Sequence, residues 1–247
     1  MTCGSRGYSA RVLLRSRTVD AAVAWLAAAC LVAGAIVIGQ ARAALGRYLY
    51  ISELGALTMP TAEQFQVGFV LVVAGILLVA VVVRDVRTPL PLLRRWAPSA
   101  ALVAAAALFL LAAAVPCSAG CPSLLTAEAQ WRDWVHIVAA VLAFAAGCVA
   151  MLQFATARDR WVARLSIAGG LAVGIIAATG GIISLARGNT DIGSTLEYVA
   201  AGIGVAWMLA MVVVHSLPHA AAAGAAPQAA DASARHGMRV PADVAID

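Results

Sequence analysis

The stretch QVGFVLVVAGILLVAVVV, residues 66–83, decides the fold, because it runs for eighteen residues without a charge. A hydrocarbon core about 30 Å thick needs about 20 apolar residues of α-helix to cross it. Backbone amides find no water inside lipid, so a crossing segment must satisfy them within a helix. Residues 66–83 therefore predict a transmembrane helix.

Five further apolar segments of similar length fill most of the 247-residue chain. They cover residues 21–39, 98–115, 134–154, 162–185 and 194–214. The composition, 63% hydrophobic and 12% charged, lies far from that of soluble domains. The sequence therefore predicts an all-α integral membrane bundle of six transmembrane helices over residues 21–215. Residues 1–20 are expected to form a basic cytoplasmic tail and residues 216–247 a disordered one.

The arginines predict the orientation of the bundle. All 17 basic residues are arginine, and 13 of them fall in the two tails and in the second and fourth connections between apolar segments. Short loops rich in arginine stay in the cytoplasm, so both termini are expected there. The bias toward arginine and alanine is typical of a GC-rich bacterial genome, which favours a bacterial cytoplasmic membrane. Ala41-Arg42-Ala43 resembles a signal-peptidase site, but the preceding 19 apolar residues favour a retained helix.

The formal net charge of +5 does not indicate a nucleic-acid partner. The basic residues are scattered over short loops, where they set topology and contact anionic headgroups. Membrane lipids are therefore the expected partners, and no nucleic acid is expected.

The few ionisable groups near the spans gather at one end of the predicted bundle. Glu53 follows the first segment directly after Ser52, Asp133 and His136 open the fourth, and Glu197 lies about one turn into the sixth. Such groups are costly at membrane depth and often mark function. We expect Glu53, His136 and Glu197 to converge on a ligand site near the outer leaflet, with Ser52 and Asp133 as further ligand-binding residues. Asp133, three residues before His136, is expected nearer to water.

Several functions could use this set of residues. The favoured one is binding or handling of a lipid or other amphiphile. An intramembrane enzyme resembling a metal-assisted hydrolase and a proton-coupled transporter are the alternatives. A purely structural role, in which Glu53 and Glu197 cap helices or pair with Arg47, Arg132 or Arg187, also stays open. The chain has no HExxH motif, and neither a metal nor a cofactor is expected.

Cys117 and Cys121 lie in the same connection, which the predicted topology places outside the cell. An oxidising compartment favours a disulfide between them, with metal ligation or two free thiols as alternatives. The sequence therefore predicts a disulfide.

Gly170 and Gly174 match the GxxxG pattern, in which missing side chains let a neighbouring helix approach closely. Packing within the chain is the favoured interpretation. Self-association through these glycines is the weaker alternative.

Short motifs around these residues resemble a known family. They are Tyr50-Ile-Ser-Glu-Leu-Gly-Ala56, Val115-Pro116-Cys117, Cys121-Pro122, His136 and Gly193-Ser-Thr-Leu-Glu197. Together they are similar to the bacterial multispanning proteins filed as domain of unknown function 998, over residues 20–215. In that family arginine often follows the last glutamate, whereas this chain has Tyr198, so an ion pair there is not implied. The resemblance implies the multispanning fold and no activity.

Overall fold

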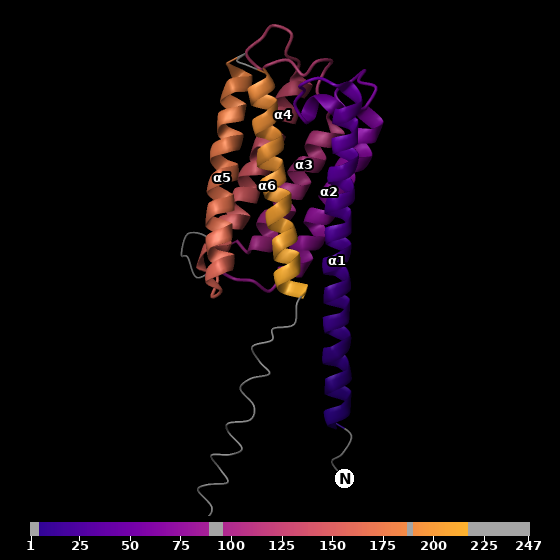
Figure 1. Cartoon of the computed structure of the whole chain (residues 1–247), viewed down its shortest axis with the longest axis vertical. Coiled ribbons are helices and arrows are strands. Elements are labelled where there is room, and N and C mark those ends of the chain that lie inside the picture. Colours follow the sequence, from indigo (N-terminus) through magenta and orange to yellow (C-terminus); the bar gives the residue numbers. More distant parts are fainter. Residues whose placement is uncertain (1–4, 89–95, 187–189, 217–247) are drawn as a thin grey trace, which may run out of the picture. The chain divides into compact units, whose positions relative to one another are not determined.

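The computed structural model describes the backbone of residues 5–88, 96–186 and 190–216, and the side chains of residues 18–88, 96–186 and 191–216. Within these ranges the chain is helical and has no strand. The elements are α1 (Ser5–Leu45), the short η1 (Ser52–Gly55), α2 (Ala62–Val82), α3 (Pro98–Ala114), α4 (Trp131–Gln153), η2 (Phe154–Thr156), α5 (Arg160–Leu185) and α6 (Thr190–Ser216), shown in Figure 1. The predicted all-α fold is confirmed, while the tail expected beyond residue 216 lies outside the described residues.

Five of these helices are long and apolar enough to span a membrane. The spans are Thr18–Leu45, Ala62–Val82, Trp131–Thr156, Arg160–Leu185 and Asp191–Ser216. The apolar α3 has 17 residues, which gives a length of about 26 Å at 1.5 Å per residue. On α5, Leu171, Ile175 and Ile182 are 52%, 65% and 66% exposed, an apolar face suited to lipid. The chain is therefore a multi-span membrane protein.

The first helix begins earlier than its apolar segment predicts. We expected the helix from Ala21, but α1 starts at Ser5 and continues without a break to Leu45. The chain has no proline before Pro60, so nothing in this stretch removes a helical hydrogen bond. The basic segment is therefore helical for most of its length.

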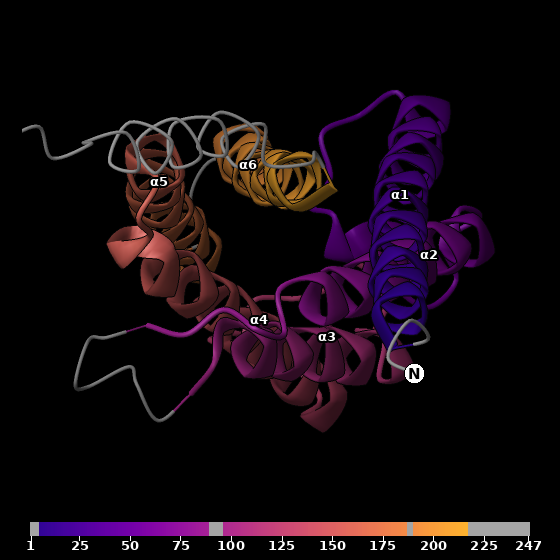
Figure 2. The ribbon, with the colours of Figure 1, turned by 90° about the horizontal axis from the view of Figure 1, so that it is seen from below.

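The six long helices form a ring in which neighbours in sequence are neighbours in space. Each helix packs on the next, and α6 closes the ring against α1, as Figure 2 shows. The backbones of α1 and α2 approach closely where a Cβ on Gly34 would lie 2.6 Å from the carbonyl oxygen of Gly68. Glycine at this position lets the two backbones meet.

Gly170 and Gly174, the glycines of the GxxxG pattern, lie against α4 of the same chain. A Cβ on Gly170 would lie 3.2 Å from Met151 Cβ, and one on Gly174 would lie 3.9 Å from Cys148 Sγ. The small residues therefore let α5 pack closely on α4. Self-association through them stays a prediction.

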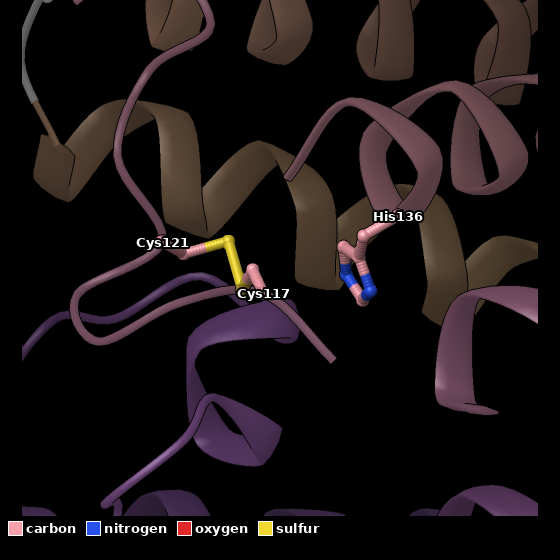
Figure 3. Close-up of side chains that lie close together, drawn as sticks. All are labelled: Cys117, Cys121 and His136. Atoms are coloured by element: carbon pink, nitrogen blue, oxygen red, sulfur yellow. A yellow bond between two sulfur atoms is a disulfide. The ribbon is translucent and has the colours of Figure 1, made fainter. Parts of the chain in front are cut away.

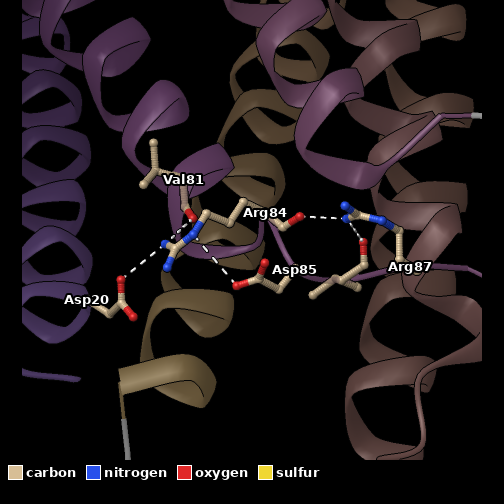
Figure 4. Close-up of polar contacts among 6 residues, drawn as sticks. Asp20, Val81, Arg84, Asp85 and Arg87 are labelled. Atoms are coloured by element: carbon tan, nitrogen blue, oxygen red, sulfur yellow. Dashed lines mark hydrogen bonds and ion pairs between the residues drawn. The ribbon is translucent and has the colours of Figure 1, made fainter. Parts of the chain in front are cut away.

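An arginine joins α1 to the end of α2, as Figure 4 shows. Arg84 Nη1 lies 3.1 Å from Asp20 Oδ1, and Arg84 Nε lies 3.6 Å from Asp85 Oδ2. Arg84 also donates to the Val81 carbonyl, and Arg87 donates to the carbonyl of Arg84. Because Arg84 and Asp20 are about half exposed, the pair contributes at most about 1 kcal/mol. This basic end of α2 is opposite to its first residues, which follow η1 and Glu53.

Candidate functional site

An apolar cavity of about 420 Å³ lies inside the ring. All six long helices and η1 contribute to its wall. Four phenylalanines in edge or stacked contact run along one side, with ring centroids 5.3–5.6 Å apart: Phe65, Phe69, Phe109 and Phe144. The volume falls within the range of about 300–1,000 Å³ that is usual for small-molecule sites.

The polar side chains of the cavity wall are concentrated at one end. At the end of the bundle where η1 lies, the wall is lined by four polar residues: Ser52, His136, Glu197 and Tyr198. Trp207 also lines the wall but follows Glu197 by ten residues in α6, so it lies about 15 Å further along the helix axis at 1.5 Å per residue. Its indole nitrogen donates to Ser166 Oγ at 2.9 Å, so it is already satisfied. The cavity is therefore polar at the end beside η1, here called its mouth, and apolar along the rest of its length.

Two glutamates hold consecutive backbone amides at this mouth. Glu197 Oε2 accepts from the N–H of Ile51 and Glu53 Oε2 from the N–H of Tyr50, both at 2.7 Å. Among the described residues, neither carboxylate lies in an ion pair with arginine. Arg187, one of the expected partners, lies outside the described residues. The glutamates thus anchor the segment before η1, with Glu197 tying it to α6.

Burial raises the pKa of Glu53 above its ordinary value of 4.5. The hydrogen bond from the Tyr50 amide and the charge of Arg47 oppose this rise but do not cancel it. Glu53 lies outside the membrane spans, in the segment between α1 and α2. Its protonation is therefore shifted toward neutral pH.

Tyr50 fixes the same segment against two other helices. Its hydroxyl lies where a Cβ on Gly193 would be. Burial raises the pKa of the phenol, and Ser184 of α5 lies close enough to oppose that rise. Only glycine at position 193 leaves room for the phenol. The motif beginning at Gly193 therefore has two structural parts, a notch for Tyr50 and the Glu197 carboxylate.

His136 is buried, with 7% of its surface exposed, and is oriented by the end of α3. Its Nδ1 lies 2.7 Å from the carbonyl oxygen of Ala112 and 3.1 Å from that of Val115. Carbonyl oxygens only accept, so Nδ1 carries the proton and donates. The second nitrogen, Nε2, is then the one with a lone pair to offer a ligand.

Asp133 does not line the cavity and holds the loop before α4. It was expected nearer to water, but its side chain is completely buried. Its carboxylate accepts from Ser118 N at 2.7 Å, from Ser118 Oγ at 2.8 Å and from Gln130 N at 2.8 Å. It therefore closes the loop before α4 and caps that helix.

A disulfide joins Cys117 and Cys121 next to His136, as Figure 3 shows. Their Cα atoms are 5.2 Å apart, within the usual range. Both Sγ atoms and a ring nitrogen of His136 lie within 4.8 Å of one another. Ser52 Oγ lies 3.9 Å from Cys121 Sγ, so the sulfurs are also close to the cavity mouth. Two cysteines and a histidine are a donor set that can hold a metal when the thiols are reduced.

The structure brings together part of the predicted set. Ser52, His136 and Glu197 line one cavity. Glu53 does not line it but holds the amide next to the one that Glu197 holds. Sequence reasoning missed Tyr198 as part of the wall and the closeness of the cysteines to His136. Tyr198, whose ring faces the Arg42 guanidinium at 4.0 Å, was identifiable only as an interfacial aromatic residue.

Comparison with known proteins gives a family. Residues 26–214 match the model of the family described as Protein of unknown function (DUF998). This match covers most of the chain, so the protein belongs to that family. No curated protein and no solved structure matches the chain.

Proposed function

We propose that this DUF998 membrane protein binds an amphiphile. The apolar part of the ligand lies along the cavity, and its polar group lies against Ser52, His136 and Glu197. The observation that carries the proposal is the distribution of polarity: one apolar cavity with polar side chains at a single end. A ligand with a polar head and a hydrocarbon or aromatic body matches that distribution.

The unpaired acceptors at the mouth support a head that donates protons, and the Tyr198 hydroxyl, which has no partner among the described residues, can donate in return. Glu197 uses Oε2 for Ile51, and no described residue bonds its second oxygen. With Nδ1 donating to carbonyls, Nε2 is the ring nitrogen of His136 that can accept from a ligand. Hydroxyl or ammonium heads therefore suit this end better than a phosphate.

Filling the cavity tests the apolar part of the proposal. On α4 the lining residues follow one face, with His136, Ala140, Gly147 and Met151 among them. A Cβ on Gly147 meets no atom within 4 Å, so Gly147→Leu places a side chain in the open space. Gly181→Leu on α5 is the matched control, because Gly181 is exposed, has open space at its Cβ and does not line the cavity.

The readout is native mass spectrometry of protein released from mild detergent. We expect a bound lipid or other amphiphile on the wild type and on Gly181→Leu, and its loss from Gly147→Leu. An adduct of equal occupancy on both leucine variants would contradict the proposal.

The polar part is tested by Glu197→Gln with Glu63→Gln as control, since Glu63 is exposed at the start of α2. We compare displacement of the bound amphiphile by an alkylamine, an alkanol and a fatty acid of one chain length. The amine is expected to compete best, and its advantage over the acid is expected to shrink in Glu197→Gln only.

We further propose that the mouth faces the outside of a bacterial cytoplasmic membrane. The support is the arginine distribution, with Arg84, Arg87, Arg158 and Arg160 at the opposite end. An impermeant thiol reagent on whole cells is expected to label Ser123→Cys and not Arg158→Cys, in a background in which the native cysteines are serine. Labelling of Arg158→Cys alone would reverse the orientation.

A further inference from the structure

The cluster of Cys117, Cys121 and His136 has the composition of a metal site. Its three donor atoms come within 4.8 Å of one another from two elements, the loop after α3 and the first turns of α4. Cys117 is fully buried and Cys121 is partly exposed. Two thiolates and an imidazole form a ligand set that favours Zn²⁺ and other thiophilic ions.

The surroundings of His136 match those of a metal-ligating histidine. Such histidines generally donate the proton of one ring nitrogen to a carbonyl or carboxylate, which fixes the tautomer and aims the other nitrogen at the metal. Here Nδ1 lies 2.7 Å from the Ala112 carbonyl oxygen. That bond leaves Nε2 as the ligand atom, and Figure 3 shows the imidazole beside the two cysteines.

We propose that reduction of the Cys117–Cys121 disulfide converts this cluster into a zinc site. Two molecules of a thiol reductant give two protein thiols and one small disulfide, so electrons and protons balance. Zn²⁺ then replaces the two thiol protons and binds both thiolates and His136 Nε2. The fourth position is left to water or to the polar group of a cavity ligand, because His136 and Ser52 face the cavity. The disulfide form holds no zinc, because a cysteine sulfur binds the metal as a thiolate and the disulfide has none.

This inference does not depend on the proposed amphiphile, because the site consists of the protein's own donors. Its test uses the full chain in detergent with Cys3, Cys30 and Cys148 changed to serine, so that Cys117 and Cys121 are the remaining thiols. The protein is reduced with a phosphine, freed of reductant without oxygen and exposed to Zn²⁺. Bound zinc is then measured by atomic emission.

We expect about one zinc per reduced chain and almost none on the disulfide form. His136→Gln is expected to weaken binding at least about tenfold, whereas the control His215→Gln leaves it unchanged. X-ray absorption of the zinc-loaded background protein, with His136 intact, is expected to show two sulfur ligands and one imidazole. This measurement decides the question even if His136→Gln fails to fold.

Two results would overturn the inference. One is a reduced protein whose two thiols react with alkylating reagent but which binds no zinc. The other is a zinc ion whose absorption spectrum contains no imidazole ligand.

Discussion

The carboxylate of Glu197 and the backbone amide of Ile51 are 2.7 Å apart although 146 residues separate them in the chain. This bond ties the segment before η1 to α6 at the cavity mouth. Tyr50, the preceding residue, is held by Glu53 and fits against Gly193. The first and last parts of the bundle therefore meet at the same place where the polar lining residues lie.

The bond between Glu197 and Ile51 is expected to contribute to stability. Glu197→Ala leaves the amide of Ile51 without its acceptor, which costs about 1–3 kcal/mol. Glu197→Gln keeps an acceptor oxygen and is expected to cost less. The measurement is thermal unfolding in detergent, with Glu63→Gln as a control that changes stability by less than about 0.5 kcal/mol. An unchanged Glu197→Ala protein would show that the bond is not significant.

Gly193 is expected to be intolerant of any side chain. Its Cβ would occupy the position of the Tyr50 hydroxyl and lie 2.9 Å from Cζ, so Gly193→Ala displaces the phenol. Such overpacking costs about 1–3 kcal/mol. Gly202→Ala in the same helix is the control, because its Cβ meets no atom within 4 Å. There alanine is expected to be neutral or to stabilise the helix by about 1 kcal/mol.

A double-mutant cycle tests whether contact with the Tyr50 hydroxyl causes the loss of stability in Gly193→Ala. Tyr50→Phe removes the hydroxyl, so Gly193→Ala is expected to cost less in that background than in the wild type. An additive pair would mean that the loss at position 193 has another origin.

The sequence was sufficient to predict the helices but not how their faces are arranged. The uncharged run at residues 66–83 is long and apolar enough for a spanning helix, and α2 covers Ala62–Val82. The start of α1 was missed because hydropathy marks the lipid boundary, and a helix does not have to end there. Hydropathy alone therefore gives the spans more reliably than the helix ends.

The candidate site was only partly predictable for a different reason. His136 and Glu197 each lie near the start of an apolar segment, so the sequence alone could place both at the same end of the bundle. The role of Asp133 depends on Ser118, which lies 15 residues away across a loop without regular structure. The approach of His136 to the cysteines depends on the same loop. Periodicity cannot fix such contacts, since loop conformation sets them.

Asp133 is expected to be essential for the loop before α4. Its one carboxylate accepts three hydrogen bonds. In asparagine an NH₂ group would replace one of the carboxylate oxygens and would face these N–H and O–H donors without an acceptor. Asp133→Asn is therefore expected to lose about 2–3 kcal/mol. It is also expected to speed hydrogen exchange at the Ser118 amide. Asp191→Asn, at an exposed acid in the first turn of α6, is the control and is expected to change neither quantity.

Glu53 is expected to make stability depend on pH. Burial raises its pKa in the folded protein above the ordinary value of 4.5, so between these two pKa values the folded state binds more protons than the unfolded state. The stabilising contribution is therefore complete below the unfolded pKa and is lost as the pH rises through the folded pKa. Glu53→Gln removes this dependence, because glutamine does not titrate. We expect the unfolding temperature of Glu53→Gln, relative to the wild type, to rise as the pH increases from the ordinary pKa of 4.5 toward neutral pH. Glu63→Gln, at an exposed carboxylate, is expected to show no such trend. A constant difference between Glu53→Gln and the wild type over this range would show that Glu53 titrates alike in both states.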